Sequence, residues 1–160
     1  MIKWAFQALP EKDRFGLLFE NVEGSELSLC TGALGASRAS YALALDCEPD
    51  QINPRWEEAL VNPLKPAIVE KAACQEVVLM GDEAKLSDLP VPTWTPGKDP
   101  APYITTTVMT KLVDSDNQNS GVYRTLVRDD HHVVVNMNPR RGGNDQCETW
   151  WSQGKAAPGA

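Results

Sequence analysis

The chain has 160 residues, of which 42% are hydrophobic and 23% charged, and it carries a formal net charge of −7. This composition predicts a globular protein, and the acidic balance excludes a typical nucleic-acid binder, which presents a basic face. No apolar run approaches the roughly 20 residues that span a bilayer, and the N-terminus lacks the basic-then-apolar layout of a secretion signal, so we expect a cytoplasmic protein without membrane contact.

Short strands are expected at several places in the first half of the chain. Residues 15–23 are mostly apolar and residues 26–30 alternate, and both patterns are typical of strands. Residues 67–70 and 76–80 also have strand composition. Residues 86–89 are too short for more than a turn of helix or a loop.

Two helices are expected between these strands. Residues 37–47 have apolar side chains at helical spacing, and Ser37 is a suitable N-cap. A second helix is expected over residues 53–61, with Asn53 as its N-cap and Pro54 at the first helical position, where its missing N–H costs nothing.

A proline-rich segment, residues 90–102, follows. Its five prolines exclude a helix or a central strand. A flexible linker is one interpretation. The neighbouring Trp94, Tyr103 and Ile104 favour instead an ordered, extended connection that packs against another part of the chain. We expect a domain boundary near this segment, between residues 95 and 96.

The last third of the chain is rich in β-branched residues. Residues 104–112 alternate as a strand does, residues 114–120 form a polar turn, and residues 121–128 and 132–138 predict a hairpin. Three such strands in an open sheet leave unpaired edges, which proteins normally cover. The sequence therefore looks unfinished.

The hairpin carries arginines and ends in the loop Arg140-Arg141-Gly142-Gly143. Guanidinium groups bind phosphate through two hydrogen bonds, and glycine lets the backbone approach a ligand closely. The pattern predicts a pocket for a phosphorylated ligand. A generic basic hairpin is the plainer alternative.

The cysteines and histidines do not predict a site. The four cysteines are scattered without a CxxC pair, so we expect reduced, structural thiols; they are Cys30, Cys47, Cys74 and Cys147. His131 and His132 are adjacent, and neighbouring residues of a strand point to opposite faces, so they are not expected to bind one ion together.

Several blocks of the sequence resemble one known family. Asn119-x-Gly121-x-Tyr123-Arg124 resembles the N-x-G-x-Y-R signature of the UbiD-type decarboxylases, which use prenylated FMN. Arg141-Gly142-Gly143 resembles the second cofactor loop of that family. Three upstream blocks are also similar to family motifs: F-E-N-V-E-G at residues 19–24, C-Q-E-V-V-L at 74–79, and L-P-V-P-T through P-Y-I-T at 89–105.

The resemblance implies an α+β fold in two parts. Residues 1–95 would form a small mixed α/β domain, and residues 96–160 the beginning of a split β-barrel flavin-binding domain that is truncated here. The chain would correspond to about the first third of such an enzyme.

The resemblance also implies a cofactor site on two strands and a loop. Its members would be Val122, Tyr123, Arg124, Asn136, Met137, Asn138, Arg141 and Gly142. Arg124 would be the catalytic residue, a fixed cation near the flavin and the substrate carboxylate. The alternative for Arg124 is a surface ion pair with Asp129 or Asp130, which contributes little. Two asparagines within a strand are unfavourable, so we expect hydrogen-bond partners for Asn136 and Asn138.

Asn119 is the expected metal ligand. Its amide oxygen suits Mn²⁺ or Mg²⁺, and the resemblance implies a metal beside the cofactor phosphate; a turn asparagine is the alternative. The chain departs from the family at Arg140, where a metal-binding histidine is common. Arginine has only donors and cannot coordinate a cation. Either the metal is bound differently, or Arg140 neutralises phosphate charge itself.

Three functions stay open at this point. The resemblance implies part of a decarboxylase or carboxylase that acts on an aromatic or α,β-unsaturated carboxylic acid, as a homo-oligomer or completed by another chain. The alternatives are a non-catalytic flavin-binding subunit and a structural homologue that has lost its ligand. The family's proton-handling carboxylates are absent from these 160 residues, so we expect the chain alone to be inactive.

Overall fold

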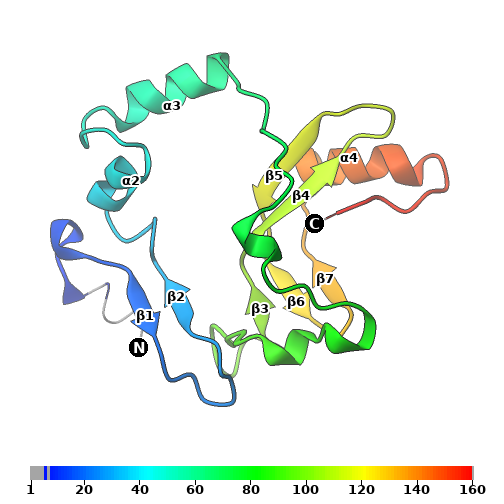
Figure 1. The fold of residues 1–160 in the computed structure, drawn as a ribbon, viewed down its shortest axis with the longest axis horizontal. Coiled ribbons are helices and arrows are strands. Elements are labelled where there is room, and N and C mark those ends of the chain that lie inside the picture. The colour runs from blue at the N-terminus through cyan, green and yellow to red at the C-terminus, as the bar shows by residue number, and fades with distance from the viewer. Residues whose placement is uncertain (1–5, 7, 160) are drawn as a thin grey trace. The chain divides into compact units, whose positions relative to one another are not determined.

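The computed structural model describes residues 6 and 8–159, and the chain divides into two compact units, Met1–Val78 and Leu79–Ala160 (Figure 1). Both units combine helices with antiparallel strands, which confirms the α+β class. The boundary expected between residues 95 and 96 lies further along the chain and stays a prediction. None of the helices in the described part is long and apolar enough to cross a membrane.

The first unit begins with a short antiparallel hairpin. β1 (Leu17–Phe19) pairs with β2 (Leu29–Thr31), and Leu18 lies opposite Cys30. The connection between them contains Gly24 at φ +79, a conformation that glycine adopts without steric cost. Both strands are shorter than expected, because the ladder between them contains only three residue pairs.

α2 (Arg38–Ala44) follows, and its predicted cap is confirmed. The backbone N–H of Ser40 donates to Ser37 Oγ at 3.3 Å, which satisfies one of the free amides of the first turn. Ala42 is buried on its inner face. The helix ends before the predicted residue 47, and Asp46 then adopts a left-handed backbone with φ +49.

α3 (Ile52–Val61) starts earlier than the sequence predicts. Gln51 is its N-cap, and its side chain makes no capping hydrogen bond, so the expected cap at Asn53 is wrong. Pro54 is therefore the third helical residue rather than the first. The position is tolerated because the first-turn amides have no partner within the helix.

The strands expected at residues 67–70 and 76–80 are not formed. Short 3₁₀ turns occur nearby instead, at Ala73–Gln75 and Gly81–Glu83, and the turn expected at residues 86–89 is confirmed as Leu86–Asp88. A strand needs a hydrogen-bonded neighbour, and within the described residues no strand pairs with these two runs.

The second unit contains two antiparallel sheets. β3 (Tyr103–Ile104), β6 (Thr125–Val127) and β7 (Val133–Val135) form one of them in the order β3-β6-β7. The β6–β7 hairpin confirms the central part of the predicted hairpin. Its strands are shorter than predicted, because residues 121–122 pair in the other sheet and the segment after Val135 leaves the ladder. Residues 118–120, predicted as part of a polar turn, also lie in a strand of that other sheet.

The other sheet pairs β4 (Thr107–Lys111) with β5 (Gln118–Val122). The run 104–112, predicted as one strand, is split, because Ile104 belongs to β3 in the first sheet. Two short links, residues 105–106 and 123–124, therefore connect the two sheets. Within the described residues the strands form three separate sheets, counting β1–β2, and none closes into a barrel.

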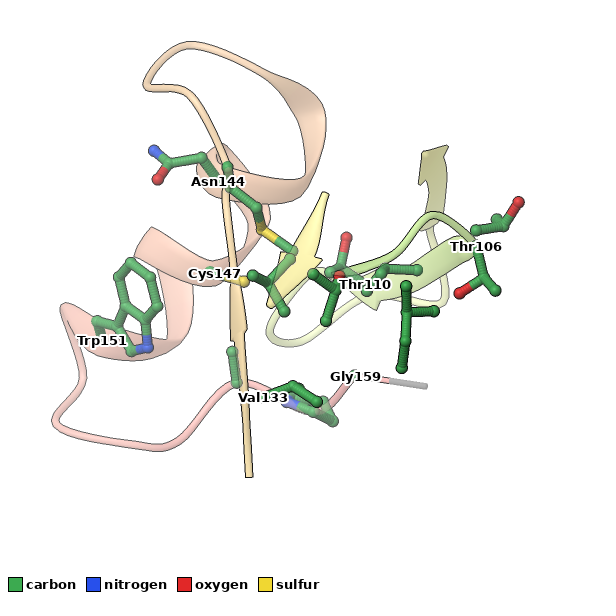
Figure 2. A pocket seen from close by; sticks show the side chains of 15 residues that line it. Thr106, Thr110, Val133, Asn144, Cys147, Trp151 and Gly159 are labelled. Atoms are coloured by element: carbon green, nitrogen blue, oxygen red, sulfur yellow. The ribbon is translucent and has the colours of Figure 1, made fainter. Parts of the chain in front are cut away.

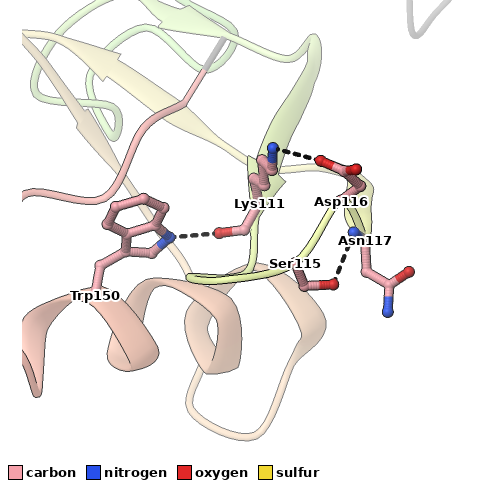
Figure 3. A network of polar contacts seen from close by, with 5 residues as sticks. All are labelled: Lys111, Ser115, Asp116, Asn117 and Trp150. Atoms are coloured by element: carbon pink, nitrogen blue, oxygen red, sulfur yellow. Dashed lines mark hydrogen bonds and ion pairs between the residues drawn. The ribbon is translucent and has the colours of Figure 1, made fainter.

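α4 (Gly142–Trp151) was not predicted; the glycines at its start indicated a loop. It packs against β4 and β5. Trp150 Nε1 donates to the carbonyl of Lys111 at 2.6 Å, while Lys111 Nζ pairs with Asp116 Oδ1 at 3.0 Å (Figure 3). The Trp150 hydrogen bond attaches the C-terminal half of the helix to the end of β4.

The proline-rich segment is an ordered connection rather than a flexible linker. The backbone N–H of Tyr103 donates to the carbonyl of Pro92 at 3.2 Å, and Trp94 Nε1 donates to the carbonyl of Tyr103 at 2.8 Å. The N–H of Val127 donates to the carbonyl of Pro102 at 3.0 Å. The segment is therefore fastened to the edge of the β3-β6-β7 sheet.

Candidate functional site

The end of β5 and the start of α4 meet at Tyr123. The backbone N–H of Gly143 donates to Tyr123 Oη at 3.0 Å, and Asn119 Nδ2 donates to the same oxygen at 3.3 Å. Asn119 lies opposite Thr110 in the β4–β5 ladder, and its Nδ2 is 3.5 Å from Thr110 Oγ1. The structure thus brings together the predicted residues Asn119 and Tyr123.

Gly142 and Gly143 allow this close approach. A Cβ on Gly142 would lie 2.5 Å from Asn119 Oδ1, and a Cβ on Gly143 would lie 2.5 Å from Tyr123 Oη. A carbon atom and a non-bonded oxygen do not approach so closely, so one of the two groups would have to shift. A larger residue would force the Asn119 or Tyr123 side chain, or the helix start, to shift, so the observed contacts depend on the two glycines.

The first turn of α4 can attract an anion. Free amides and the helix dipole give a helix N-terminus a partial positive charge. Arg141 is the N-cap, its side chain makes no capping bond, and it is exposed. Arg140 is also exposed and has a left-handed backbone with φ +61, which is uncommon for a residue other than glycine.

Arg124 lies in the link between β5 and β6. Its Nη2 donates to Asp99 Oδ1 at 2.9 Å, and its Cζ lies 4.2 Å from the centre of the Tyr103 ring. The hydrogen bond from Arg124 lowers the pKa of Asp99. No sequence motif indicates Asp99, although it is the only acidic residue of the proline-rich segment, residues 90–102.

The surface ion pairs considered for Arg124 at the β6–β7 turn are wrong. Asp129 Oδ1 accepts from the N–H of His131 at 3.0 Å and contacts His132 Nδ1 at 2.7 Å. These two contacts lower the pKa of Asp129, with the His131 amide the larger cause. Asp130 Oδ1 accepts from the backbone N–H of Ser87. The Ser87 side chain is the main cause that lowers the pKa of Asp130, and the backbone hydrogen bond adds to it.

Asn136, Met137 and Asn138 follow the end of β7. The backbone N–H of Asn136 donates to the carbonyl of Arg124 at 3.0 Å. Asn136 and Asn138 are exposed beyond the strand, so the expectation of asparagines within a strand is wrong. Met137 is half-buried, and its Sδ would lie 3.2 Å from a Cβ on Gly143. Met137 therefore joins the cluster around Tyr123.

A largely apolar cavity of about 500 Å³ lies beside this cluster (Figure 2). Its walls come from β4, β6, β7, α4 and the segment 157–159. Figure 2 shows Thr110 and Cys147 among its lining residues, and burial raises the pKa of the Cys147 thiol. Met137 lines the cavity, whereas Arg124 and Arg141 do not. This cavity could not be predicted from the sequence, because its walls include the helix α4, which was not predicted.

The described residues do not fit a bound Mn²⁺. Within that part of the chain, no group of three or more histidine, cysteine, aspartate or glutamate side chains is placed to hold a metal. Asn119 contributes one amide oxygen, and the nearby Arg140 and Arg141 bring positive charge. The same surroundings suit a phosphate group, because glycine amides, a helix N-terminus and guanidinium groups all bind phosphate.

Comparisons with known proteins agree with these observations. Residues 67–160 match the model of a family described as UbiD, the 3-octaprenyl-4-hydroxybenzoate carboxy-lyase Rift-related domain. The UbiD-class enzyme HmfF from Pelotomaculum thermopropionicum, solved in complex with FMN, is 25% identical with a TM-score of 0.82 over 90% of this chain and 32% of that one.

Two further solved structures are similar. An evolved dimeric form of HmfF in complex with prFMN is 25% identical with a TM-score of 0.81, over 94% of this chain and 36% of that one. Apo 3,4-dihydroxybenzoic acid decarboxylase (AroY) from Klebsiella pneumoniae is 25% identical with a TM-score of 0.78, over 90% and 31%. The chain spans about a third of the length of these enzymes. Because the family model covers more than half of its residues, the chain belongs to the UbiD family.

Proposed function

We propose that this chain forms the flavin-phosphate side of a UbiD-class decarboxylase or carboxylase that acts on an aromatic or α,β-unsaturated carboxylic acid. The observation that carries the proposal is the contact of Asn119 and Tyr123 with the glycines at the start of α4. The start of α4 thus lies against this polar cluster, and Arg140 and Arg141 directly precede it in the sequence, which supports the proposal. Similar proteins bound to FMN and prFMN support the same assignment.

The residues have separate roles in this proposal. The first turn of α4 and Arg141 would bind the phosphate, and Met137 would contact the flavin. When bound, prenylated FMN supplies an electron sink for carbon–carbon cleavage next to a carboxylate. Arg124 would hold the carboxylate of the acid through its guanidinium fork. We assign no step to a metal, because the donor set around Asn119 does not fit one.

A flavin-holding role without turnover is the second candidate, and one observation favours it. Among the described residues, Asp99 is the carboxylate that hydrogen-bonds Arg124. Its Oδ1 accepts from Arg124 and is therefore not free to carry a proton to the product. Neither Asn119 nor Tyr123 hydrogen-bonds a carboxylate or a histidine in the described part of the chain. A proton donor for the product is therefore not provided by this cluster.

Titration with FMN and with riboflavin tests the phosphate assignment. The two flavins differ by the phosphate, so FMN should bind at least about ten-fold more tightly, equivalent to about 1.4 kcal/mol. Flavin fluorescence would report both affinities. Equal affinities would contradict the phosphate site, and release of CO₂ from an acid by the flavin-loaded chain would refute the flavin-holding candidate.

A further inference from the structure

Asp99 is held by both of its carboxylate oxygens. Oδ1 accepts from Arg124 Nη2 at 2.9 Å, and Oδ2 accepts from the backbone N–H of Thr95 at 2.7 Å. The backbone N–H of Asp99 in turn donates to the carbonyl of Thr95 at 2.9 Å. The Asp99 side chain is 11% exposed, whereas that of Arg124 is 53% exposed. The Asp99 carboxylate is therefore held in one position, and the more exposed guanidinium of Arg124 extends from it toward solvent.

Tyr103 restrains the same guanidinium from another direction. The Arg124 Cζ lies 4.2 Å from the ring centre, within the range of a cation–π contact. Tyr103 is itself fixed, because its N–H and C=O are bonded to Pro92 and Trp94. The hydrogen bond to Asp99 at one edge of the guanidinium and the Tyr103 ring against its face together define the plane of the group. The remaining N–H donors of Arg124 stay available for a ligand.

We propose that Asp99 and Tyr103 are positioning residues that orient Arg124 to receive the carboxylate of a small organic acid. The nature of that ligand rests on the proposed function; the orientation of Arg124 does not. An arginine side chain has many rotamers, and ordering them on binding weakens affinity. Ordering them beforehand through the proline-rich segment removes that cost.

The Arg124–Asp99 contact differs from an ordinary surface ion pair. Lys111 Nζ and Asp116 Oδ1 lie at a similar distance, 3.0 Å, but the Asp116 side chain is fully exposed. Exposed pairs of that kind contribute little to either stability or order. Asp116→Asn is therefore a matched control for Asp99→Asn, since both remove one carboxylate charge from an ion pair. In Asp99→Asn the amide oxygen can still accept from Thr95.

The orientation of Arg124 can be measured directly by NMR on the ¹⁵N-labelled 160-residue chain. Hindered rotation of the guanidinium group should separate the Nη signals of Arg124. These signals would be assigned by their disappearance in Arg124→Lys. We expect Asp99→Asn to merge these signals and Asp116→Asn to leave them unchanged. A merged signal in the unmutated chain, or separate signals that persist in Asp99→Asn, would overturn the positioning role.

Ligand binding provides the second readout, with benzoate as the probe and FMN present. We expect Asp99→Asn to weaken benzoate binding about five-fold by loss of preorganisation, while FMN affinity stays within about two-fold of the unmutated chain. If Asp99 acts through Arg124, the double variant Asp99→Asn with Arg124→Ala should bind as weakly as Arg124→Ala alone. Losses that add would show an independent role and overturn the proposal.

The two experiments separate the two proposals. An unmutated chain that binds neither FMN nor benzoate would count against the proposed function, and the NMR signals would still decide whether Asp99 orients Arg124. Tyr103→Leu is a second variant for the same question, because it removes the ring without touching either charge. We expect it to broaden the Arg124 signals; unchanged signals would remove Tyr103 from the proposal.

Discussion

At the scale of single residues, the candidate site depends on close contacts that only particular side chains permit. Gly142 and Gly143 lie against Asn119 and Tyr123 at distances that exclude a Cβ. These residues could be predicted because they match family motifs. Asp99 could not, because no motif marks it and its contact with Arg124 depends on how the proline-rich segment folds.

Gly142→Ala should weaken FMN binding. The added Cβ would lie 2.5 Å from Asn119 Oδ1, so either the Asn119 side chain or the helix start must shift, and both belong to the candidate site. We expect a loss of at least about five-fold in FMN affinity, equivalent to about 1 kcal/mol, measured by flavin fluorescence. Gly35→Ala is the control, because nothing lies within 4 Å of its Cβ position. Equal affinities of the two variants would contradict the packing argument.

Asp99 should stabilise the fold above pH 4 more than below it. Its folded-state pKa is held below the ordinary value of 3.8, mainly by the hydrogen bond from Arg124. The contribution is therefore complete above the pKa of the unfolded chain and is lost as the pH falls through the folded-state pKa. The pKa values of Asp129 and Asp130 are lowered too, but both residues are present in the unmutated chain and in Asp99→Asn, so their effects cancel in a comparison of the two.

Urea unfolding of the unmutated chain and of Asp99→Asn at several pH values provides the measurement. We expect the unmutated chain to be the more stable at neutral pH, and the difference in unfolding free energy to shrink as the pH falls below 3.8. A difference that stays constant or grows in acid would be inconsistent with the ion pair.

At the scale of elements, two structures that depend only on neighbouring residues were predicted correctly, and several that need a distant partner were not. The Ser37 cap and the short turn at Leu86–Asp88 were predicted correctly, because each depends on neighbouring residues. The runs 67–70 and 76–80 were predicted wrongly as strands, since β-branched composition does not supply a partner. α4 was missed because two glycines are unfavourable in a helix, and the contact with Tyr123 that requires them is not local.

The anchoring of α4 should depend on Trp150. Trp150→Phe removes the hydrogen bond to the carbonyl of Lys111 and should reduce the unfolding free energy by about 1 kcal/mol. Trp151→Phe is the control, because it removes the same atoms from a side chain that is 56% exposed. It should reduce the unfolding free energy by less than about 0.5 kcal/mol. Urea unfolding would compare the two, and equal losses would mean that the hydrogen bond contributes nothing.

At the scale of the whole molecule, the buried apolar core is small. The buried hydrophobic residues of the described part are Ala36, Ala42 and Cys147, and no large side chain is fully buried there. Large apolar side chains are exposed instead, with Leu64 at 93% and Ile68 at 100%. Surfaces of this kind are typical of proteins that contact a partner. The α+β class could be predicted without this information, whereas the size of the core could not.

The isolated chain should therefore bind ANS and self-associate as its concentration rises. Light scattering after size exclusion would show a mass that increases with concentration, and Ile68→Ser should reduce both the association and the ANS fluorescence. Asp116→Asn, which changes no apolar residue, should leave both unchanged. A concentration-independent monomer without ANS fluorescence would contradict this prediction.

The two links between the sheets of the second unit have a mechanical consequence. Residues 105–106 and 123–124 lie next to each other, because Ile104 is paired with Thr125 and Thr107 with Val122. The chain after β7 also joins the two sheets through α4, so any bending of one sheet against the other would change all of these connections. Tyr123 and Arg124 lie in one of the links, so the hydroxyl that contacts α4 and the guanidinium that contacts Asp99 would move together.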